Sequence, residues 1–580
     1  ETNAVLKDAL EEKGIVLEHG PRRTHFKKLR AKAGVGDDFA APIVAPTVFA
    51  PTHFDFDKCL KLFPLEKPRE LQVEAIREVL KAYEGGAVYV VLDAPTGTGK
   101  SAIAMTLARY FGRTWFCTLT AQLQDQYVRD FANLGLVTLL GRGKFRCRQN
   151  KALSCKEGKH FFKGKNACGP QCPYVVARNL ALKADFTIAN YHSFLWNVGN
   201  ARVFQGEERE DGASPRRPFI VCDEQHSIEG FLLEQIGLMV KLSKLSLGGK
   251  TPVPPNELYK AAPYFDFLRD ELLPRLLQRV KLVVDPKERE DLERFIRKVQ
   301  FLDTQRETEE WIPERSTREN GTLDEDWFAL KPLTVKAYGQ WIWGWGQRQL
   351  FMSATVLSPG QFVDSLGLDP TLGEHVELDN PFPPQNRPVV VQGLNMSKGA
   401  REETWPHMAK VVDKLLTHHA QEKGLLLTPS NEMLKFIRAN LSRTNASRLI
   451  FAFGDDRTQK YNEHISSKSP SVLAASGYWE GADLRGDSSV FQIIPSVPRP
   501  MWAGQVKARA QQNPAWYRMQ SFQKLIQGMG RSIRCFDYAT EILTTEGWKN
   551  KRALKVGDIA YGIPLNAFEE GRRSLRWGRV

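Results

Sequence analysis

The sequence lacks any long apolar run. No uninterrupted hydrophobic stretch is long enough to span a bilayer, and the first residues do not have the pattern of a signal peptide. Cysteine is also scarce, because eight cysteines among 580 residues are too few for a secreted disulfide scaffold. We therefore expect a cytoplasmic protein with no membrane partner. Its first residue is Glu rather than Met, as expected of a fragment.

Acidic residues are too few to balance the basic ones. The chain has 81 Lys and Arg residues against 67 Asp and Glu residues, a net charge of +14 at pH 7. Such a surplus favours a polyanionic partner. The contents of 42% hydrophobic and 26% charged residues are ordinary for a globular protein. Because a chain of this length is too long for one core, we expect three or four domains.

The stretch APTGTGKS at residues 94–101 is the first motif with a defined chemistry. Residues 87–93 before it are apolar and rich in Val, as in a buried parallel strand, and residues 102–111 after it have a helical pattern. A chance glycine loop is the alternative interpretation. A glycine loop between a strand and a helix is, however, typical of a phosphate cradle. The order of the elements therefore predicts nucleotide binding.

The chemistry of such a loop gives each residue a task. Gly97 and Gly99 let backbone N–H groups turn inward onto the phosphates, Lys100 reaches the terminal phosphates, and the Ser101 hydroxyl holds Mg²⁺. ATP and Mg²⁺ are therefore the expected cofactors. The expected phosphate-binding residues are Thr96, Gly97, Thr98, Gly99, Lys100 and Ser101.

A pair of carboxylates follows a second apolar strand, in FIVCDEQH at residues 219–226. Asp223 would bind Mg²⁺ through water, and Glu224 would orient the water that attacks the γ-phosphate. His226 would link this site to a nucleic-acid side. An Asp-Glu pair after a strand is unremarkable by itself, but in combination with the glycine loop it predicts an NTPase.

Four further motifs follow: FMSAT (351–355), GLLLTPS (424–430), GYWEGADL (477–484) and QGMGRSIR (527–534). In the last of them Gln527, Arg531 and Arg534 are spaced i, i+4 and i+7, so they share one helical face. Two guanidiniums on one face suit the charge that develops on a γ-phosphate, as arginine fingers do. A solvated basic helix face is the alternative, and the order of the other motifs argues against it.

The order of these motifs resembles that of the superfamily two helicases, over roughly residues 60–534. The resemblance implies two RecA-like domains that close on one ATP. It also implies that PRELQ (68–72) contacts the nucleotide and that TLTAQLQDQY (118–127) grips the nucleic-acid backbone. The residues that it adds to the ATP and Mg²⁺ site are Arg69, Gln72, Glu480, Asp483, Gln527, Arg531 and Arg534.

Cys147, Cys155, Cys168 and Cys172 lie between the two ATPase motifs, separated by seven, twelve and three residues. Four thiolates hold either tetrahedral zinc or an iron–sulfur cluster, and the absence of paired two-residue spacings favours iron only slightly. A four-cysteine insertion at this place is similar to that of the XPD/DinG helicases, as are the flanks GRGKFRC, CPYVVAR and ADFTIANYH. The resemblance implies a 4Fe–4S cluster held by the four cysteines, 5′-to-3′ polarity and single-stranded DNA threaded beside the cluster. The box here reads DEQH rather than DEAH.

Four other segments are less informative. Basic residues surround the cysteines, and a phosphate-facing surface and a solvated loop are equally good interpretations of them: Arg142, Lys144, Arg146, Arg148 and Lys151. Residues 227–340 have helical periodicity, which the family resemblance identifies as an arch over the DNA channel. WIWGWG at 341–346 suits base stacking, but core packing is favoured because it runs into the next strand. Residues 1–60 have no acidic exonuclease motif.

After Arg534 the sequence changes character, and residues 535–562 resemble the opening of an intein. The resemblance assigns Cys535 as the splicing nucleophile, whose thiol attacks the preceding carbonyl and converts the peptide bond into a thioester. The alternating TEILTT that follows predicts a strand of the Hint fold.

Two features depart from the intein pattern. Ala539 stands where Asp or Gly usually precedes the Thr, and the Thr-x-x-His segment and terminal His-Asn pair do not occur before Val580. We therefore expect a truncated precursor or the N-terminal part of a split intein. A divergent helicase tail that happens to start with Cys is the alternative.

The predicted fold class is α/β: two RecA-like domains with parallel sheets, an Fe–S insertion and a helical arch insertion, followed by the start of an all-β Hint fold. The expected parts are residues 1–60 (basic module and linker), 61–145 with 176–226 and 346–375 (first RecA-like domain), 146–175 (Fe–S insertion), 227–345 (arch), 376–534 (second RecA-like domain, incomplete) and 535–580 (intein segment).

The predicted function is an ATP hydrolase and DNA helicase of the XPD/DinG type. It would act as a monomer in repair or replication, in the cytoplasm of a bacterial or phage-infected cell. Its expected partners are single-stranded and forked DNA and a complementary C-terminal fragment with the rest of the intein and helicase. Two alternatives stay open: a translocase that remodels protein–DNA complexes without unwinding, and a splicing precursor with no motor activity of its own.

Overall fold

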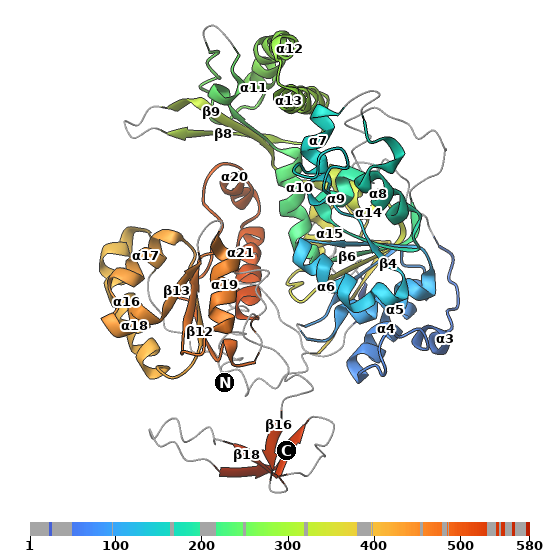
Figure 1. Cartoon of the computed structure of the whole chain (residues 1–580), viewed down its shortest axis with the longest axis vertical. Helices are drawn as coiled ribbons and strands as arrows, with labels where there is room; N and C mark the ends of the chain where they lie inside the picture. Colours follow the sequence, from blue (N-terminus) through green and yellow to red (C-terminus); the bar gives the residue numbers. More distant parts are fainter. Residues whose placement is uncertain are drawn as a thin grey trace. The chain divides into compact units, whose positions relative to one another are not determined.

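The computed structural model describes residues 23–25, 49–95, 97–162, 167–197, 216–247, 251–317, 323–379, 396, 398–452, 456–477, 484, 486–530, 541–544, 547–550, 559–562 and 576–579. The chain divides into two compact units. Unit 1 is Glu1–Val391 with Pro498–Gln527, and unit 2 is Gln392–Val497 with Gly528–Val580. Each unit contains its own parallel sheet (Figure 1).

An eight-stranded sheet forms the centre of unit 1, and all its strands are parallel except β1. In order across the sheet they are β1 (Arg23–His25), β11 (Gly373–Glu377), β2 (Tyr89–Asp93), β10 (Gly346–Ser353), β6 (Arg217–Asp223), β3 (Thr114–Thr118), β5 (Phe186–Asn190) and β4 (Leu136–Thr138). The central strands are mostly apolar because helices cover both faces. β1 comes from the region expected to be a separate basic module, so part of that region extends this sheet instead.

Alternate residues of each strand pack on opposite faces of the sheet, as the pleat requires. Val90 and Leu92 of β2 belong to one hydrophobic cluster, and Tyr89 and Val91 belong to the other. The first cluster includes α3 (Phe56–Leu60), α4 (Glu70–Glu84), α5 (Lys100–Phe111) and α6 (Ala121–Phe131), and the second includes α9 (Tyr191–Asn197), α10 (Ile228–Ile236), α14 (Gln340–Trp343) and α15 (Pro359–Ser365).

The tryptophans of WIWGWG lie in the second of these clusters. Trp341 and Trp343 are each only 7% exposed, and Trp343 Nε1 donates a hydrogen bond to the carbonyl of Leu366 at 3.1 Å. The interpretation of this motif as core packing is therefore confirmed.

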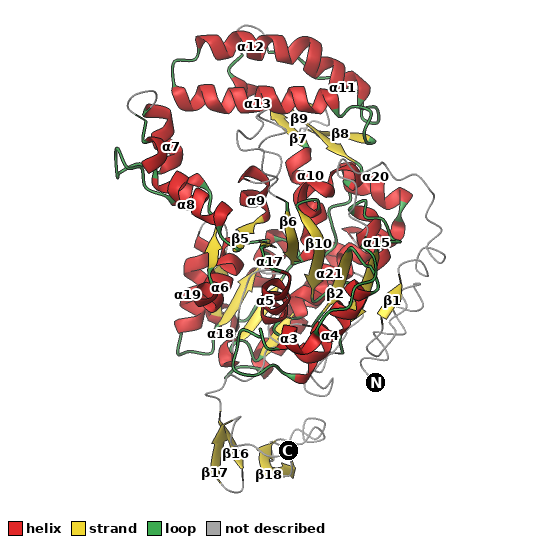
Figure 2. Ribbon diagram, turned by 90° about the vertical axis from the view of Figure 1, so that its right-hand side faces the viewer, coloured by secondary structure: helices red, strands yellow, loops and turns green. Residues whose placement is uncertain are grey.

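Two insertions interrupt the sheet of unit 1. The cysteine-containing one has short turns η2 (Arg142–Lys144) and η4 (Gly169–Gln171) and the helices α7 (Cys155–Phe161) and α8 (Pro173–Lys183). In the other, α11 (Ala262–Asp266) continues through a π-helical turn at Phe267–Leu272 into α12 (Leu273–Leu282), which packs against α13 (Pro286–Thr304) (Figure 2).

The arch region is not purely helical, in contrast to our expectation. An antiparallel sheet of β7 (Leu238–Lys241), β9 (Leu323–Pro332) and β8 (Trp311–Thr317) lies in it. Phe328 and Leu330 of β9 both belong to the large hydrophobic cluster of unit 1, so this strand is part of the core. The helical periodicity of residues 227–340 gave no indication of it.

A four-stranded parallel sheet forms the centre of unit 2. Its order is β13 (Leu449–Ala452), β14 (Val472–Ala475), β12 (Gly424–Leu427) and β15 (Phe491–Ile493). The helices of this unit are α16 (Arg401–His418), α17 (Asn431–Ala439), α18 (Arg443–Arg448) and α19 (Arg457–Ser466). Leu426 and Leu427 of β12 lie in different hydrophobic clusters, so both faces of this sheet are also covered.

After β15 the chain returns to unit 1. This return segment contains α20 (Gly504–Gln512) and most of α21 (Pro514–Met529). Arg509 forms a buried ion pair with Glu229 of α10, and Trp516 Nε1 donates to the same carboxylate at 3.2 Å. The division of the chain therefore differs from the continuous second domain expected at residues 376–534.

A separate antiparallel sheet follows, in the order β17 (Gly547–Asn550), β16 (Glu541–Thr544), β18 (Ile559–Gly562) and β19 (Arg576–Arg579). β16 coincides with the strand predicted from TEILTT. Four short strands are not enough to identify a Hint domain. Among the helices that the structure describes, none is long and apolar enough to cross a membrane.

Candidate nucleotide site

The phosphate loop connects β2 to α5. Gly97 and Gly99 have φ angles of 86° and 81°, in the left-handed region that glycine tolerates, so the backbone turns sharply. Lys100 is the first residue of α5, and its Nζ donates to the carbonyl of Ala94 at 3.2 Å. Ser101 lies in the same first turn. The N–H groups of a helix N-terminus together with a lysine ammonium suit a polyphosphate.

Arg69 and Gln72, at the start of α4, are attached to this loop. Arg69 Nη1 donates to the carbonyl of Gly97 at 2.8 Å, and Gln72 Nε2 donates to the carbonyl of Thr98 at 2.9 Å. A Cβ on Gly99 would lie 2.3 Å from Gln72 Nε2, so only glycine leaves room for this amide. The two residues predicted from PRELQ therefore support the shape of the loop.

The acid pair lies at the same edge of the sheet. Asp223 ends β6 and is in register with Met352 of β10, whose next residue is in register with Asp93 of β2. Because parallel strands end at one edge, the loop after β2 and the carboxylates after β6 face the same space. Glu224 has φ 51°, a rare conformation for a residue other than glycine, and its N–H donates to Asp223 Oδ1 at 2.9 Å.

Two tyrosine hydroxyls that we did not predict also hold Asp223. Tyr127 Oη donates to Asp223 Oδ2 at 2.8 Å, and Tyr191 Oη donates to the main-chain carbonyl of Asp223 at 2.7 Å. Both tyrosines occur in motifs that we quoted, at the ends of TLTAQLQDQY and ADFTIANYH. An aromatic residue there looks like any core residue, so the sequence contained no signal for these contacts.

The electrostatics of the site favour a cation. Burial raises the pKa of Asp223 to about 6, with a smaller contribution from the charge of Glu224, while Lys100 opposes the rise. Burial and then Glu377 raise the pKa of Asp93 to about 8, and Lys100 again opposes the rise. Both carboxyl groups are thus poorly solvated, and each has a neighbouring acidic side chain. A bound Mg²⁺ would compensate for both effects.

Gln527 joins the acid pair through a network of polar side chains. Its Nε2 contacts His226 Nε2 and lies 3.3 Å from Thr355 Oγ1. His226 Nδ1 lies 2.9 Å from Ser353 Oγ and 3.5 Å from Glu224 Oε2, and Ser353 Oγ lies 3.2 Å from Thr355 Oγ1. Residues of DEQH, FMSAT and QGMGRSIR therefore meet in one place.

Six expected site residues lie outside the described residues: Thr96, Glu480, Asp483, Arg531, Arg534 and Cys535.

Three of the four cysteines of the insertion lie in one small cluster. Cys155 and Cys172 are buried with Tyr174, and Cys168 packs against them. Cys155 Sγ lies 3.4 Å from Cys172 Sγ. Burial, and then the Cys172 thiol, raise the pKa of Cys155 to about 11.

Cys147 is the fourth of these cysteines. It is 3% exposed, and a Cβ on Gly158 would lie 2.4 Å from its Sγ, so a glycine makes room for this thiol. Within the described residues, no group of three or more His, Cys, Asp or Glu side chains is arranged to hold a metal ion. Thiols are nevertheless the donors that soft metals and iron–sulfur clusters take.

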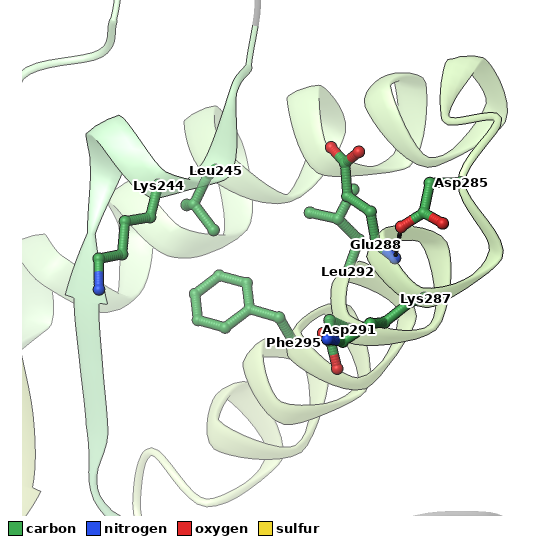
Figure 3. A pocket seen from close by; sticks show the side chains of 8 residues that line it. All are labelled: Lys244, Leu245, Asp285, Lys287, Glu288, Asp291, Leu292 and Phe295. Atoms are coloured by element: carbon green, nitrogen blue, oxygen red, sulfur yellow. Dashed lines mark hydrogen bonds between the residues drawn. The ribbon is translucent and has the colours of Figure 1, made fainter. Parts of the chain in front are cut away.

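A pocket of about 410 Å³ lies elsewhere, between the turn after β7 and the N-terminal half of α13 (Figure 3). Leu245, Leu292 and Phe295 form its apolar part, and charged side chains surround them: Lys244, Asp285, Lys287, Glu288 and Asp291. Because it contains none of the phosphate-loop or acid-pair residues, this pocket is not the nucleotide site.

Two family models match the chain. Residues 65–245 match the res subunit of type III restriction enzymes, and residues 414–549 match the helicase C-terminal domain. The first match contains the phosphate loop and the acid pair, and the second runs across the Arg534–Cys535 bond. No curated protein sequence matches the chain.

Solved structures agree with these matches. An XPD helicase structure is 16% identical, with a TM-score of 0.56, and the match covers 81% of this chain and 95% of that one. The chain therefore shares the fold of this XPD helicase structure. A second XPD structure, in its apo form, is 15% identical with a TM-score of 0.53 and coverage of 80% and 94%. In this helicase fold, the two parallel sheets correspond to the RecA-like domains.

Proposed function

We propose that the chain is an ATP-dependent DNA helicase of the XPD/DinG type, which couples ATP hydrolysis to 5′-to-3′ movement along single-stranded DNA. The observation that carries the proposal is the meeting of three sequence motifs at one sheet edge. The phosphate loop with Lys100, the Arg69–Gln72 pair and the acid pair at 223–224 all lie there. The helicase fold supports the same conclusion.

The proposed hydrolysis assigns one role to each group. Lys100 and the loop N–H groups bind the β- and γ-phosphates, and Ser101 and Asp223 hold Mg²⁺. Glu224 orients the attacking water, and its Oε2 lies 3.5 Å from His226 Nδ1. Arg531 and Arg534 would stabilise the charge that develops on the γ-phosphate. The remaining expected members of the site are Glu480, Asp483 and Gln527.

Replacement of the loop lysine tests this function. Lys100→Ala should abolish ATP hydrolysis stimulated by single-stranded DNA, because the charge on the terminal phosphates loses its partner. Lys435→Ala, at an exposed position of α17, is the matched control and should hydrolyse ATP like the unaltered chain. Near-normal turnover by Lys100→Ala would overturn the assignment of the loop.

Basic residues of the cysteine insertion support a nucleic-acid surface. Lys144, Arg146, Arg148 and Lys151 are exposed, and Arg142 lies over the ring of Tyr174, with its guanidinium carbon 4.5 Å from the centroid. Exposed guanidiniums and ammoniums suit phosphates. Reversing the charge of two of them, as in Arg146→Glu with Arg148→Glu, should weaken binding of a single-stranded oligonucleotide and reduce its dependence on salt.

We further propose that Cys147, Cys155, Cys168 and Cys172 hold a 4Fe–4S cluster. The contact between Cys155 and Cys172, with Cys168 packed against them, supports this proposal. The iron–sulfur cluster would fix the insertion beside the DNA path. Protein purified without oxygen should contain iron and acid-labile sulfide. Stoichiometric zinc without iron would show that the four thiols bind a structural zinc instead.

The segment after Arg534 supports a second proposal, that residues 535–580 begin an intein. The strand β16 at the position predicted from TEILTT favours it. In the first step the Cys535 thiol attacks the carbonyl of Arg534, the peptide C–N bond breaks, and a thioester and a free amine result. A complementary fragment would supply the remaining splicing residues. The helicase C-terminal family model matches as far as residue 549. A divergent helicase tail, the alternative to an intein, would also give such a match.

Peptide mapping of the native gene product around Arg534 separates these two interpretations. Arg534 joined to a new residue, with residues 535–580 missing, would establish splicing. Arg534 still joined to Cys535 would favour the divergent tail. Strand displacement on naked duplex DNA separates a helicase from a translocase that only moves along the strand.

A further inference from the structure

A buried tyrosine hydroxyl contacts the carboxylate that would hold Mg²⁺. Tyr127 is 2% exposed, and its Oη donates to Asp223 Oδ2 at 2.8 Å. The other oxygen, Oδ1, accepts a hydrogen bond from the N–H of Glu224 at 2.9 Å. Because each carboxylate oxygen has its own donor, the plane of the carboxyl group is fixed. Tyr127 is therefore able to determine which lone pairs of Asp223 face a cation.

Tyr127 belongs to the helix that carries the expected nucleic-acid segment. The segment at 118–127 begins at the end of β3, and Thr120 caps the N-terminus of α6 by accepting from the N–H of Leu123 at 3.2 Å. Tyr127 follows seven positions after this cap. One end of α6 would thus contact nucleic acid, and the same helix contacts the Mg²⁺ carboxylate.

The C-terminal half of α6 packs against the core of unit 1. Gln124 is fully buried, and its Nε2 lies within hydrogen-bond distance of the carbonyls of Leu139 and Ile188, at 3.2 Å from each. The ring of Tyr127 packs at 5.9 Å from that of Phe116 and at 6.0 Å from that of Phe131. A displacement at the N-terminus of such a helix moves the Tyr127 hydroxyl with it.

We propose that Tyr127 is a positioning residue that couples nucleic-acid binding on α6 to the Mg²⁺ carboxylate of Asp223. This inference rests on the proposed function. Nucleic acid bound at the N-terminal end of α6 acts through the Tyr127 hydroxyl on the orientation of Asp223. Hydrolysis of ATP is therefore most efficient when the segment at 118–127 is occupied.

A purely structural role for the same hydroxyl makes a different prediction. If the hydroxyl only donates a hydrogen bond to a buried carboxylate, its removal lowers stability. The dependence of ATP hydrolysis on Mg²⁺ and on nucleic acid then stays unchanged. If it positions Asp223, both dependences change. Tyr127→Phe separates the two roles because it removes the hydroxyl and keeps the ring packing.

The experiment titrates Mg²⁺ in ATP hydrolysis by the full chain, with and without a single-stranded oligonucleotide. Tyr127→Phe should raise the half-saturating Mg²⁺ concentration about tenfold and reduce the stimulation by oligonucleotide by a similar factor, as expected for loss of a hydrogen bond to a charged group. Tyr83→Phe is the matched control. Tyr83 is fully buried in the same unit, and its Oη donates to the carbonyl of Gln349 at 2.7 Å.

Two outcomes would overturn the inference: unchanged Mg²⁺ dependence and stimulation in Tyr127→Phe, or equal changes in both Phe variants. A readout that does not need turnover keeps it separate from the proposed function. Mn²⁺ binding followed by electron paramagnetic resonance should be about tenfold weaker in Tyr127→Phe. If the unaltered chain hydrolyses no ATP, the proposed function fails and the coupling with it. The Mn²⁺ titration then decides only whether Tyr127 positions Asp223.

Discussion

Replacing Gly99 with Ala tests how the phosphate loop and Gln72 fit together. Gly99 has φ 81°, where an L-residue costs about 1–2 kcal/mol. The added methyl would lie 2.3 Å from Gln72 Nε2, so the amide must move. Its hydrogen bond to the carbonyl of Thr98 then breaks, at about 0.5–1.5 kcal/mol. The sum, about 1.5–3.5 kcal/mol, is the cost of holding the loop in its phosphate-binding shape. Because nucleotide binding needs this shape, the affinity should be roughly 10- to 400-fold weaker.

Gly135→Ala is the control for the cost of placing an L-residue at a positive φ. Gly135 has φ 83°, almost the same as Gly99, and nothing lies within 4 Å of a Cβ there. This variant should lose about 1–2 kcal/mol of stability and bind nucleotide like the unaltered chain. Urea unfolding and titration with a fluorescent ATP analogue measure the two effects. Binding by Gly99→Ala within about twofold of the unaltered chain would refute the reasoning. Adding Gln72→Ala to Gly99→Ala should remove the collision without restoring the lost hydrogen bond.

Three further predictions concern charge and packing in unit 1. The first is a pH effect. The folded-state pKa of Asp93 is about 8, above its usual value of 3.8 because of burial and then Glu377. Its contribution to stability is therefore complete below about pH 4 and is lost as the pH rises through 8. Asp93→Asn should flatten this part of the stability curve in urea unfolding, and an unchanged curve would contradict the assignment. The second is that Glu229→Ala leaves Arg509 buried without its partner and should cost about 3–5 kcal/mol. Glu78→Ala breaks only the exposed pair with Lys81 and should cost less than about 1 kcal/mol. Equal losses in these two variants would argue against a buried pair. The third is that Trp343→Ala should cost about 3–5 kcal/mol of stability and leave the affinity for single-stranded DNA unchanged, because Trp343 is a core residue. A selective loss of DNA affinity would restore the base-stacking interpretation.

The local parts of the nucleotide site could be predicted from sequence. The loop at 94–101 is flanked by β2 and α5, and Asp223 ends β6, because a Val-rich run, a glycine pair and a helical period are each visible within about ten residues. The pairing of the motifs followed from their occurrence together and in order along the chain. These inferences need only short-range patterns and the order of the motifs.

The long-range contacts could not be predicted. Tyr127 reaches Asp223 across 96 positions of sequence, and Trp516 reaches Glu229 across 287. In both cases the side chain looks like an ordinary core aromatic, and nothing local indicates its polar partner. For the same reason the sequence did not show that the helix of Gln527 returns to unit 1.

The position of β10 in the sheet explains why the FMSAT motif lies beside the phosphate loop and the acid pair. β10 lies between β2 and β6, so the hydroxyls of Ser353 and Thr355 lie between the phosphate loop and the acid pair. Neither hydroxyl carries a charge, and each is able both to donate and to accept a hydrogen bond. They can therefore respond when His226 or Gln527 changes its partner as phosphate binds or leaves. A Ser353→Ala variant would keep the strand and break the link between Ser353 and His226, so its ATP hydrolysis should become less dependent on nucleic acid. A variant that keeps its full response to nucleic acid would show that the network is only structural.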